Sequence, residues 1–210
     1  MPKIENNKLW DYRFLQLAET VAVWSKDPST KVGSVIVDDQ RRVIGLGYNG
    51  FPRGVEDHPE RYSDRDTKYL FVCHAERNAI DNAPGNIEGS TLYATLFPCS
   101  ECCKSIIQRG VKKVVTFVPS AGKRLLHNHD ISYIMLKEAG VELHQLARIY
   151  YEEWKNGIGI SGKDEGRSEI KQVQSDVHED RRFSTRYGLY SDGDIHYTSG
   201  EKDRSCKDTF

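Results

Sequence analysis

The sequence has no long apolar run. No stretch approaches the roughly 20 consecutive apolar residues that a membrane-spanning helix needs, and residues 1–8 lack the apolar core of a signal peptide. The net charge is only −1, so no overall basic field attracts a nucleic-acid backbone or an anionic membrane surface. These absences predict a cytoplasmic protein whose partners include neither nucleic acid nor membrane.

Cysteine is scarce and odd in number. The chain has five cysteines among 210 residues, and four of them fall within the stretch 73–103. An odd, clustered set argues against a disulfide framework and is typical of a reducing compartment.

The composition changes towards the C-terminus. A length of 210 residues predicts one domain plus an appendage. Beyond residue 156, glycines and mixed charges replace aliphatic residues, so little apolar surface is available to offset chain entropy. We expect a domain over 1–155 and a polar C-terminal extension over 156–210. The extension is either a flexible tail or a small add-on that docks through its aromatic residues, Phe183, Tyr187, Tyr190 and Tyr197.

Hydrophobic periodicity predicts an α/β fold. Its order α-β-β-α-β-α-β-α-β indicates a mixed five-stranded sheet sandwiched by helices. A long loop over 49–70, rich in Gly, Pro and charge, is expected to be functional. Gly140 is a natural cap for the last helix. The predicted helices are 7–24, 75–83, 100–109 and 129–139, and the predicted strands are 32–37, 43–46, 91–95, 113–118 and 141–146.

Two short motifs carry the chemistry. His74-Ala75-Glu76 is followed some two dozen residues later by Pro98-Cys99-Ser100-Glu101-Cys102. One imidazole and two thiolates supply three zinc ligands, which leave the fourth tetrahedral position open for water. Glu76 is close enough to move the protons of that water without being a ligand. This H-x-E…P-C-x-x-C pattern is a signature of zinc nucleobase deaminases.

The spacing of the ligands fits two helix starts. Cys99 and Cys102, at i and i+3, share one face of a helix, and Pro98 suits a helix entry. The positive end of the helix dipole lowers thiol pKa values. His74 opens the preceding helix, and the two N-termini are expected to converge above the edge of the sheet.

A structural zinc site and a redox C-x-x-C are the alternatives. A structural site needs a fourth ligand, and Cys103 would point to another face because it adjoins Cys102. A redox pair leaves His74 and Glu76 unexplained. We interpret Cys73 and Cys103 as small buried hydrophobes that line the site.

Longer motifs resemble deoxycytidylate (dCMP) deaminase, in that family's order over residues 9–146. The resemblance implies zinc-dependent hydrolysis of dCMP to dUMP and ammonia, which feeds thymidylate synthesis. It also implies a homo-hexamer regulated by dCTP and dTTP together with Mg²⁺, although some members lack regulation and some also accept dCTP as substrate. The motifs are Ser25–Gly33, Gly45–Gly54, His74–Ile80, Thr95–Cys102 and Lys137–Val141.

The resemblance assigns roles residue by residue. The metal ligands correspond to His74, Cys99 and Cys102, and the catalytic proton shuttle to Glu76. Asn49 is expected to meet the deoxyribose. The remaining candidates for the substrate are Ser25, Lys26 and Thr30 at the 5′-phosphate, with Ala75 and Pro98. The candidates for the effector nucleotide are Asn49, Gly50 and Arg53.

Some of these residues have plainer interpretations. Lys26 and Lys31 are also explained as solvated surface lysines, and the glycines of 45–54 as turn formers. Family members with a second, structural zinc use N-terminal cysteines, and this chain has none before Cys73. His127 and His129 are separated by a single residue at a helix entry, and we interpret them as surface or capping residues and not as a second metal site.

Three rival functions remain. A deaminase that acts on nucleic acid needs a basic, often aromatic groove, which the near-neutral charge does not indicate. A riboflavin-pathway deaminase would be accompanied by a reductase domain. A non-catalytic nucleotide sensor would have no use for the intact Glu76.

Overall fold

The computed structural model describes residues 6–118 and 129–157. The chain divides into two units, 1–164 and 165–210, and all of the second unit lies outside the described residues. The boundary predicted at 155/156 and both interpretations of the extension therefore stay predictions. His127 lies outside the described residues as well.

The sheet has five strands and mixed pairing, as predicted. The strand order is β2-β1-β3-β4-β5. β1 pairs antiparallel with both β2 and β3, whereas β3, β4 and β5 run parallel. The strands are β1 (Gly33–Val37), β2 (Val43–Tyr48), β3 (Thr91–Ala94), β4 (Lys113–Phe117) and β5 (Glu142–Leu146).

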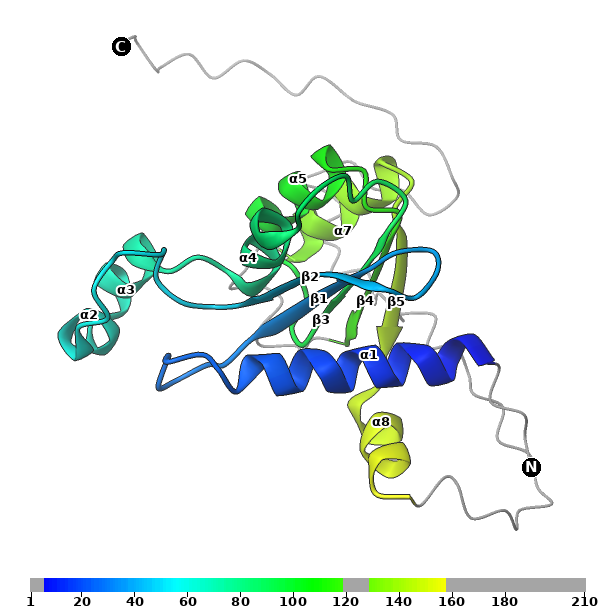
Figure 1. Ribbon diagram of the computed structural model, residues 1–210, viewed down its shortest axis with the longest axis horizontal. Helices are drawn as coiled ribbons and strands as arrows, with labels where there is room; N and C mark the ends of the chain where they lie inside the picture. The colour runs from blue at the N-terminus through cyan, green and yellow to red at the C-terminus, as the bar shows by residue number, and fades with distance from the viewer. Residues whose placement is uncertain (1–5, 119–128, 158–210) are drawn as a thin grey trace, which may run out of the picture. The chain divides into compact units, whose positions relative to one another are not determined.

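Helices cover both faces of this sheet (Figure 1), which confirms the predicted sandwich. α1 and α8 pack on one face, and α4, α5 and α7 pack on the other. The helix predicted first along the chain ends two residues early, and α8 was not expected at all. These helices are α1 (Asn6–Ala22), α4 (Ala75–Asn82), α5 (Ser100–Gln108), α7 (His129–Glu138) and α8 (Arg148–Lys155).

Strand alternation produces a separate hydrophobic core on each face. In β1, Val35 and Val37 pack towards α1, whereas Ile36 between them packs towards α4 and α5. Successive side chains of a strand point to opposite faces, so one fully buried strand contributes to both cores.

Gly47 sets the position of α4, whose N-terminus carries part of the predicted site. A Cβ atom at Gly47 would lie 2.2 Å from the backbone nitrogen of Ala79 and 2.3 Å from the carbonyl oxygen of Ala75. Any side chain there would push the helix away from β2. The backbone contact thus fixes the height at which α4 begins above the sheet.

The loop predicted over 49–70 was wrong in part, because it contains two short helices. These are α2 (Pro59–Ser63) and α3 (Arg65–Phe71). Pro59 suits the first turn of α2, and the Asp64 carboxylate caps α3 by accepting from the backbone nitrogen of Thr67 at 2.8 Å. Charge and proline had suggested a loop, but here they are helix-start signals.

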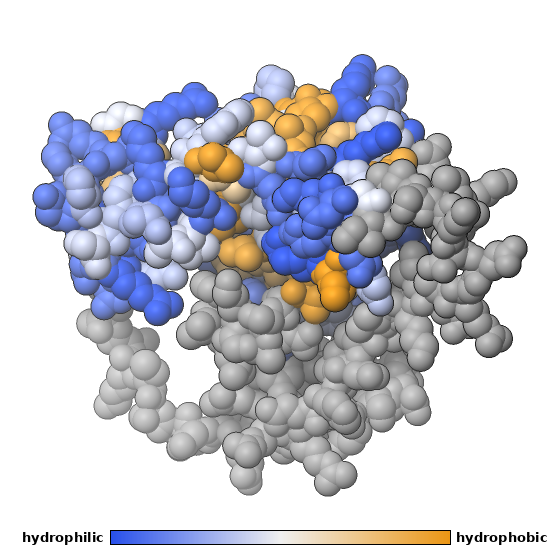
Figure 2. Space-filling model, turned by 90° about the horizontal axis from the view of Figure 1, so that it is seen from below, coloured by the Kyte–Doolittle hydropathy of each residue, from blue (hydrophilic) through white to orange (hydrophobic). Residues whose placement is uncertain are grey.

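The described surface on the side shown in Figure 2 is largely hydrophilic, with smaller hydrophobic patches between the polar side chains. Within residues 6–118 and 129–157, no helix is long and apolar enough to cross a bilayer. The further expectation, that membranes are not partners, stays a prediction.

Candidate metal centre and its cavity

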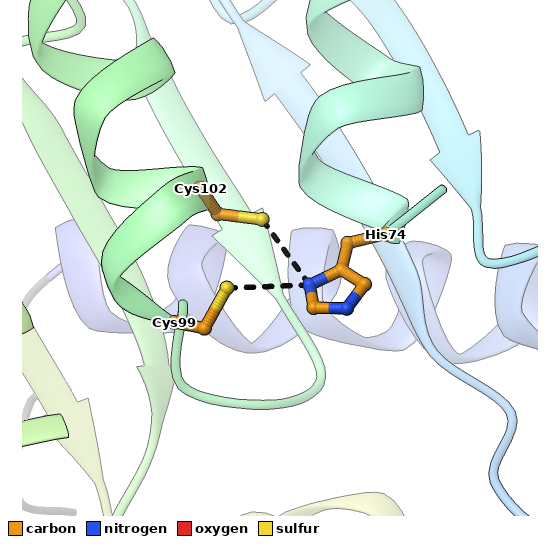
Figure 3. Close-up of side chains that lie close together, drawn as sticks. All are labelled: His74, Cys99 and Cys102. Atoms are coloured by element: carbon orange, nitrogen blue, oxygen red, sulfur yellow. Dashed lines mark hydrogen bonds between the residues drawn. The ribbon is translucent and has the colours of Figure 1, made fainter. Parts of the chain in front are cut away.

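Two helix starts bring the predicted metal ligands together. His74 is the N-cap residue of α4 and Cys99 is the N-cap residue of α5, and neither side chain forms an N-cap hydrogen bond. Cys102 lies one turn into α5, on the same side as Cys99 (Figure 3). The imidazole and both thiols are therefore free to face a common point.

The distances fit a tetrahedral zinc ion. The Nδ1 atom of His74 lies 3.3 Å from the sulfur of Cys99 and 3.5 Å from that of Cys102, and the three ligand atoms all lie within 4.8 Å of one another. Ligand atoms bound at about 2.0–2.3 Å in a tetrahedron are themselves about 3.5 Å apart. The spacing and the donor set both suit Zn²⁺.

The titration of these groups reflects their proximity. Hydrogen bonding from Cys102 and contact with His74 lower the pKa of Cys99, and hydrogen bonding to Cys99 raises the pKa of His74 to about 9. Metal binding requires a thiolate and a neutral imidazole, so loading the site releases protons.

Glu76 lies beside the ligands without joining them. Glu76 is only 3% exposed, and it lines the same cavity as His74 and Cys99. Desolvation raises the pKa of the Glu76 carboxyl, although the nearby His74 opposes that shift. A carboxyl group whose pKa is raised towards neutrality can both accept and donate a proton.

The neighbouring cysteines do not complete a closed site. Among the described residues, the cluster that can hold a metal consists of His74, Cys99 and Cys102 alone. Cys103 is fully buried and its thiol faces the carbonyl oxygen of Pro98 at 3.8 Å, as a small buried hydrophobe would. Cys73 is only half-buried, so its predicted burial was overstated.

A cavity of about 420 Å³ opens onto the metal ligands. This volume lies within the usual range for small-molecule sites. Of the candidates for substrate contact, Thr30, Asn49 and Ala75 are among its described lining residues. Ser25, Lys26 and Pro98 are not, and neither are the effector candidates Gly50 and Arg53. The lining also includes Phe97, Phe117 and Leu96, which give the cavity apolar walls.

Asn49 joins the cavity to the loop that follows α1. Its side-chain oxygen accepts from the backbone nitrogen of Val32 at 2.8 Å, and its amide nitrogen donates to the carbonyl oxygen of Thr30 at 2.9 Å. The Ser25 hydroxyl donates to the carbonyl oxygen of Asn49 at 2.7 Å. Asn49 and Ser25 thus shape the loop, whatever contact they make with a ligand.

Of the other candidates, Lys26 and Arg53 are exposed, whereas Gly50 is buried. Lys26 has a side chain that is 68% exposed and pairs with Asp57 at 2.6 Å. Arg53 donates to the side-chain oxygen of Asn82 at 2.7 Å. Gly50 forms a two-bond bridge with Cys73, the residue just before the histidine ligand.

The predictions made from the sequence placed His129 wrongly and did not include Lys68, although both residues line the cavity. His129, expected at the surface or as a cap, is 6% exposed and packs its ring 4.9 Å from that of Phe97, so its surface placement was wrong. Lys68 was hidden inside the expected loop. It is buried on α3, lines the cavity and pairs with Asp27 at 3.2 Å.

A three-ligand zinc site with an adjacent buried carboxylate, set at helix starts over an α/β sheet, defines a zinc-dependent hydrolytic deaminase. Residues 8–118 match the model of the cytidine and deoxycytidylate deaminase zinc-binding region. The chain belongs to this family.

Similar proteins agree with that placement. An uncharacterized deaminase in the luxG 3′ region of Aliivibrio fischeri is 41% identical, over 64% of this chain and 91% of that protein. Deoxycytidylate deaminase of Homo sapiens is 45% identical, over 50% of this chain and 63% of that enzyme, so the match spans less than two thirds of its length. The structure of dCMP deaminase from the cyanophage S-TIM5 in complex with dCMP and dUMP gives a TM-score of 0.52 at 27% identity, over 70% of this chain and all of that one.

Proposed function

We propose that the protein hydrolyses dCMP to dUMP and ammonia and so supplies dUMP for thymidylate synthesis. The observation that carries this proposal is the His74, Cys99 and Cys102 cluster, which shares a nucleotide-sized cavity with the buried Glu76. The relatives add the substrate, because the human enzyme is named for deoxycytidylate and the cyanophage enzyme is seen with dCMP and dUMP.

A Zn²⁺ ion held by His74, Cys99 and Cys102 would act as a Lewis acid and would lower the pKa of the attacking water. Glu76 accepts a proton from the attacking water and donates one to N3 of cytosine, which makes C4 electrophilic. The water oxygen bonds to C4, and the Glu76 carboxylate, now without its proton, takes the proton of this new hydroxyl and delivers it to the amino group. The C4–N bond then breaks, ammonia leaves and a carbonyl remains. Ala75 and Phe97 line the cavity together with Glu76.

The burial of Glu76 supports both of its roles. A carboxyl group in water would have a pKa too low to hold a proton for N3 at neutral pH. Desolvation raises the pKa of Glu76 towards the working pH, where a single group transfers protons most efficiently in both directions.

The deciding experiment follows the conversion of dCMP to dUMP by absorbance, with zinc-loaded and chelator-treated protein. We expect turnover that disappears with the metal and returns when Zn²⁺ is added. Turnover of a cytosine or adenine within single-stranded nucleic acid, with none of dCMP, would favour the nucleic-acid deaminase instead.

The finer features implied by the resemblance belong to the same proposal. They are a homo-hexamer in the cytoplasm, regulation by dCTP and dTTP with Mg²⁺ at Asn49, Gly50 and Arg53, and activity on dCTP as an alternative substrate. The Gly50–Cys73 bridge supports the regulatory part, because it links the effector candidates to the backbone beside His74. Kinetics with dCMP and dCTP, each with and without dTTP, would test the regulation and the alternative substrate.

A further inference from the structure

A buried ion pair lines the cavity, and the proton transfers proposed above do not use it. The Lys68 ammonium lies 3.2 Å from the Asp27 carboxylate and 2.8 Å from the Ser29 hydroxyl. The two charged side chains are only 10% and 4% exposed. Removing two charges from water is costly and rarely improves stability over apolar packing. A cationic group kept in a ligand cavity at such a cost indicates a role in binding.

The carboxylate of this pair is already satisfied by its own loop. Asp27 accepts from the backbone nitrogens of Ser29 at 2.8 Å and Thr30 at 3.2 Å, and from the Ser29 hydroxyl at 2.8 Å. The Asn49 amide adds a longer contact of 3.4 Å. The negative charge is therefore spread over several donors besides Lys68.

The ammonium of Lys68 is held less tightly. Its contacts with the two oxygens of Asp27 measure 3.2 and 3.4 Å, longer than the roughly 2.7–2.9 Å of a close charge-assisted bond. An ammonium group has three donors. Among the described residues, that of Lys68 donates hydrogen bonds to Asp27 and Ser29, and it also lies 5.8 Å from the centre of the Tyr69 ring. Lys68 is thus oriented at the cavity wall with capacity for an anion.

The other cations near the cavity are less suited to bind an anion. Arg148 also lines the cavity, but its guanidinium lies 4.0 Å over the Phe117 ring and pairs with Glu19 at 2.9 Å. Lys26 pairs with Asp57 in water and is not among the described lining residues.

Building on the proposed deamination of dCMP, we propose that Lys68 recognises the 5′-phosphate of the substrate and that Asp27 is the positioning residue that holds it. The incoming phosphate takes up the remaining donor capacity of the ammonium while Ser29 and Asp27 keep their contacts. Lys68 then sets the preference for a nucleotide over the corresponding nucleoside, which offers the same base and sugar without the anion.

The test compares kcat/KM for dCMP and for deoxycytidine on zinc-loaded, full-length protein. Lys68→Met should lower the ratio of the two constants at least about tenfold, because a charge-assisted bond is lost for the nucleotide alone. Lys68→Gln, which keeps a polar contact for Ser29 but no charge, should do the same, whereas Lys68→Arg should retain most of the preference. Asp27→Asn should raise KM for dCMP several-fold with little change in kcat.

The matched control is Lys113→Met, which removes the lysine of another buried Asp–Lys pair, 3.3 Å from Asp11. Its ratio should equal that of the wild type. An equal fall for both substrates in Lys68→Gln would overturn the proposal by showing a structural role only. A ratio that falls in Lys26→Met and not in the Lys68 variants would overturn it as well. A wild-type protein that deaminates deoxycytidine but gains nothing from the phosphate would contradict Lys68 alone, whereas inactivity on both would contradict the proposed function.

Discussion

The two ends of the sheet each bury an Asp–Lys pair, but the pairs have different surroundings. At the end where β3 and β4 finish, Asp27 and Lys68 line a cavity that also holds His74 and Glu76. At the other end, the Asp11 carboxylate on α1 accepts from the hydroxyl of Tyr93 at 2.8 Å and pairs with Lys113 at 3.3 Å.

The difference lies in what each pair faces. Asp11 joins α1 to β3, β4 and β5, because His144 of β5 also lies 3.5 Å from its carboxylate. Its partners come from three strands and hold the helix on the sheet. Asp27 instead has two of its four partners, Ser29 and Thr30, in its own loop, and these contacts order the wall of the cavity. The residues proposed for catalysis lie at one end of the sheet, and the contacts that hold α1 on the sheet lie at the other.

The largest effect is expected from Glu76→Gln, which removes the proposed proton shuttle beside the metal ligands. Turnover of dCMP should fall by about two to four orders of magnitude, the usual contribution of a general acid–base group. Zinc content should match the wild type, and the thermal midpoint should not fall, because a buried carboxyl group is replaced by a neutral amide of the same shape. Retention of even a tenth of the activity would contradict the role of Glu76.

Cys99→Ala should abolish stable zinc binding, because two protein ligands remain where three were present. Metal analysis after gel filtration should find the zinc largely gone, and added Zn²⁺ should no longer raise the thermal midpoint as it does for the wild type. Cys103→Ala is the control on the same helix and should retain its zinc. Full zinc occupancy in Cys99→Ala would mean that the ligand set is wrong.

Asp11→Asn should lower the stability of the protein and leave its activity largely unchanged. Breaking the buried pair with Lys113 should lower the free energy of unfolding by about 2–3 kcal/mol, measured by urea denaturation with the zinc site saturated. The kcat for dCMP should stay within a factor of two or so, since none of these residues lines the cavity. A large loss of kcat with unchanged stability would reverse the comparison between the two ends.

Acid should erase the stability difference between Asp11→Asn and the wild type. Desolvation raises the pKa of Asp11, but the hydrogen bond with His144 and the charge of Lys113 outweigh it, so the net shift is downward. A carboxyl group with a lowered folded pKa stabilises the protein above its ordinary pKa of 3.8 and loses that contribution as the pH falls below it. The free energies of unfolding of the two proteins should therefore begin to converge once the pH falls below 3.8, and a constant difference throughout the acid range would contradict the assignment.

The smallest effect is expected from the exposed pair at the protein surface. Asp57→Asn removes the partner of Lys26, whose side chain is 68% exposed, and such pairs contribute at most about 1 kcal/mol. The free energy of unfolding should change by less than that, and less still in high salt. A loss comparable to that of Asp11→Asn would show that exposure is a poor guide to these pairs.

The metal site was predictable because its signals are local. The i, i+3 spacing of Cys99 and Cys102, the proline before them and the position of His74 before a helical pattern all depend on neighbours in sequence. Hydrophobic periodicity similarly indicated the mixed sheet and its covering helices. Each of these signals depends on residues that are close in sequence, so it can be recognised without knowing the folded structure.

The cavity wall was harder to predict because it depends on contacts between distant segments. Lys68 and Asp27 are 41 residues apart, and the sequence around neither residue indicates that the two form a pair. The burial of His129 likewise depends on the Phe97 ring. One local signal was available, since Asp64 stands three residues before Thr67 as an N-cap should. It would have revealed α3, although not the partner of its lysine.

The most direct test measures dCMP turnover and the free energy of unfolding on the same zinc-loaded preparations of Glu76→Gln and Asp11→Asn. If catalysis and stability depend on opposite ends of the sheet, Glu76→Gln should be stable but inactive. Asp11→Asn should be active but less stable. Two variants that each lose both properties would contradict that separation.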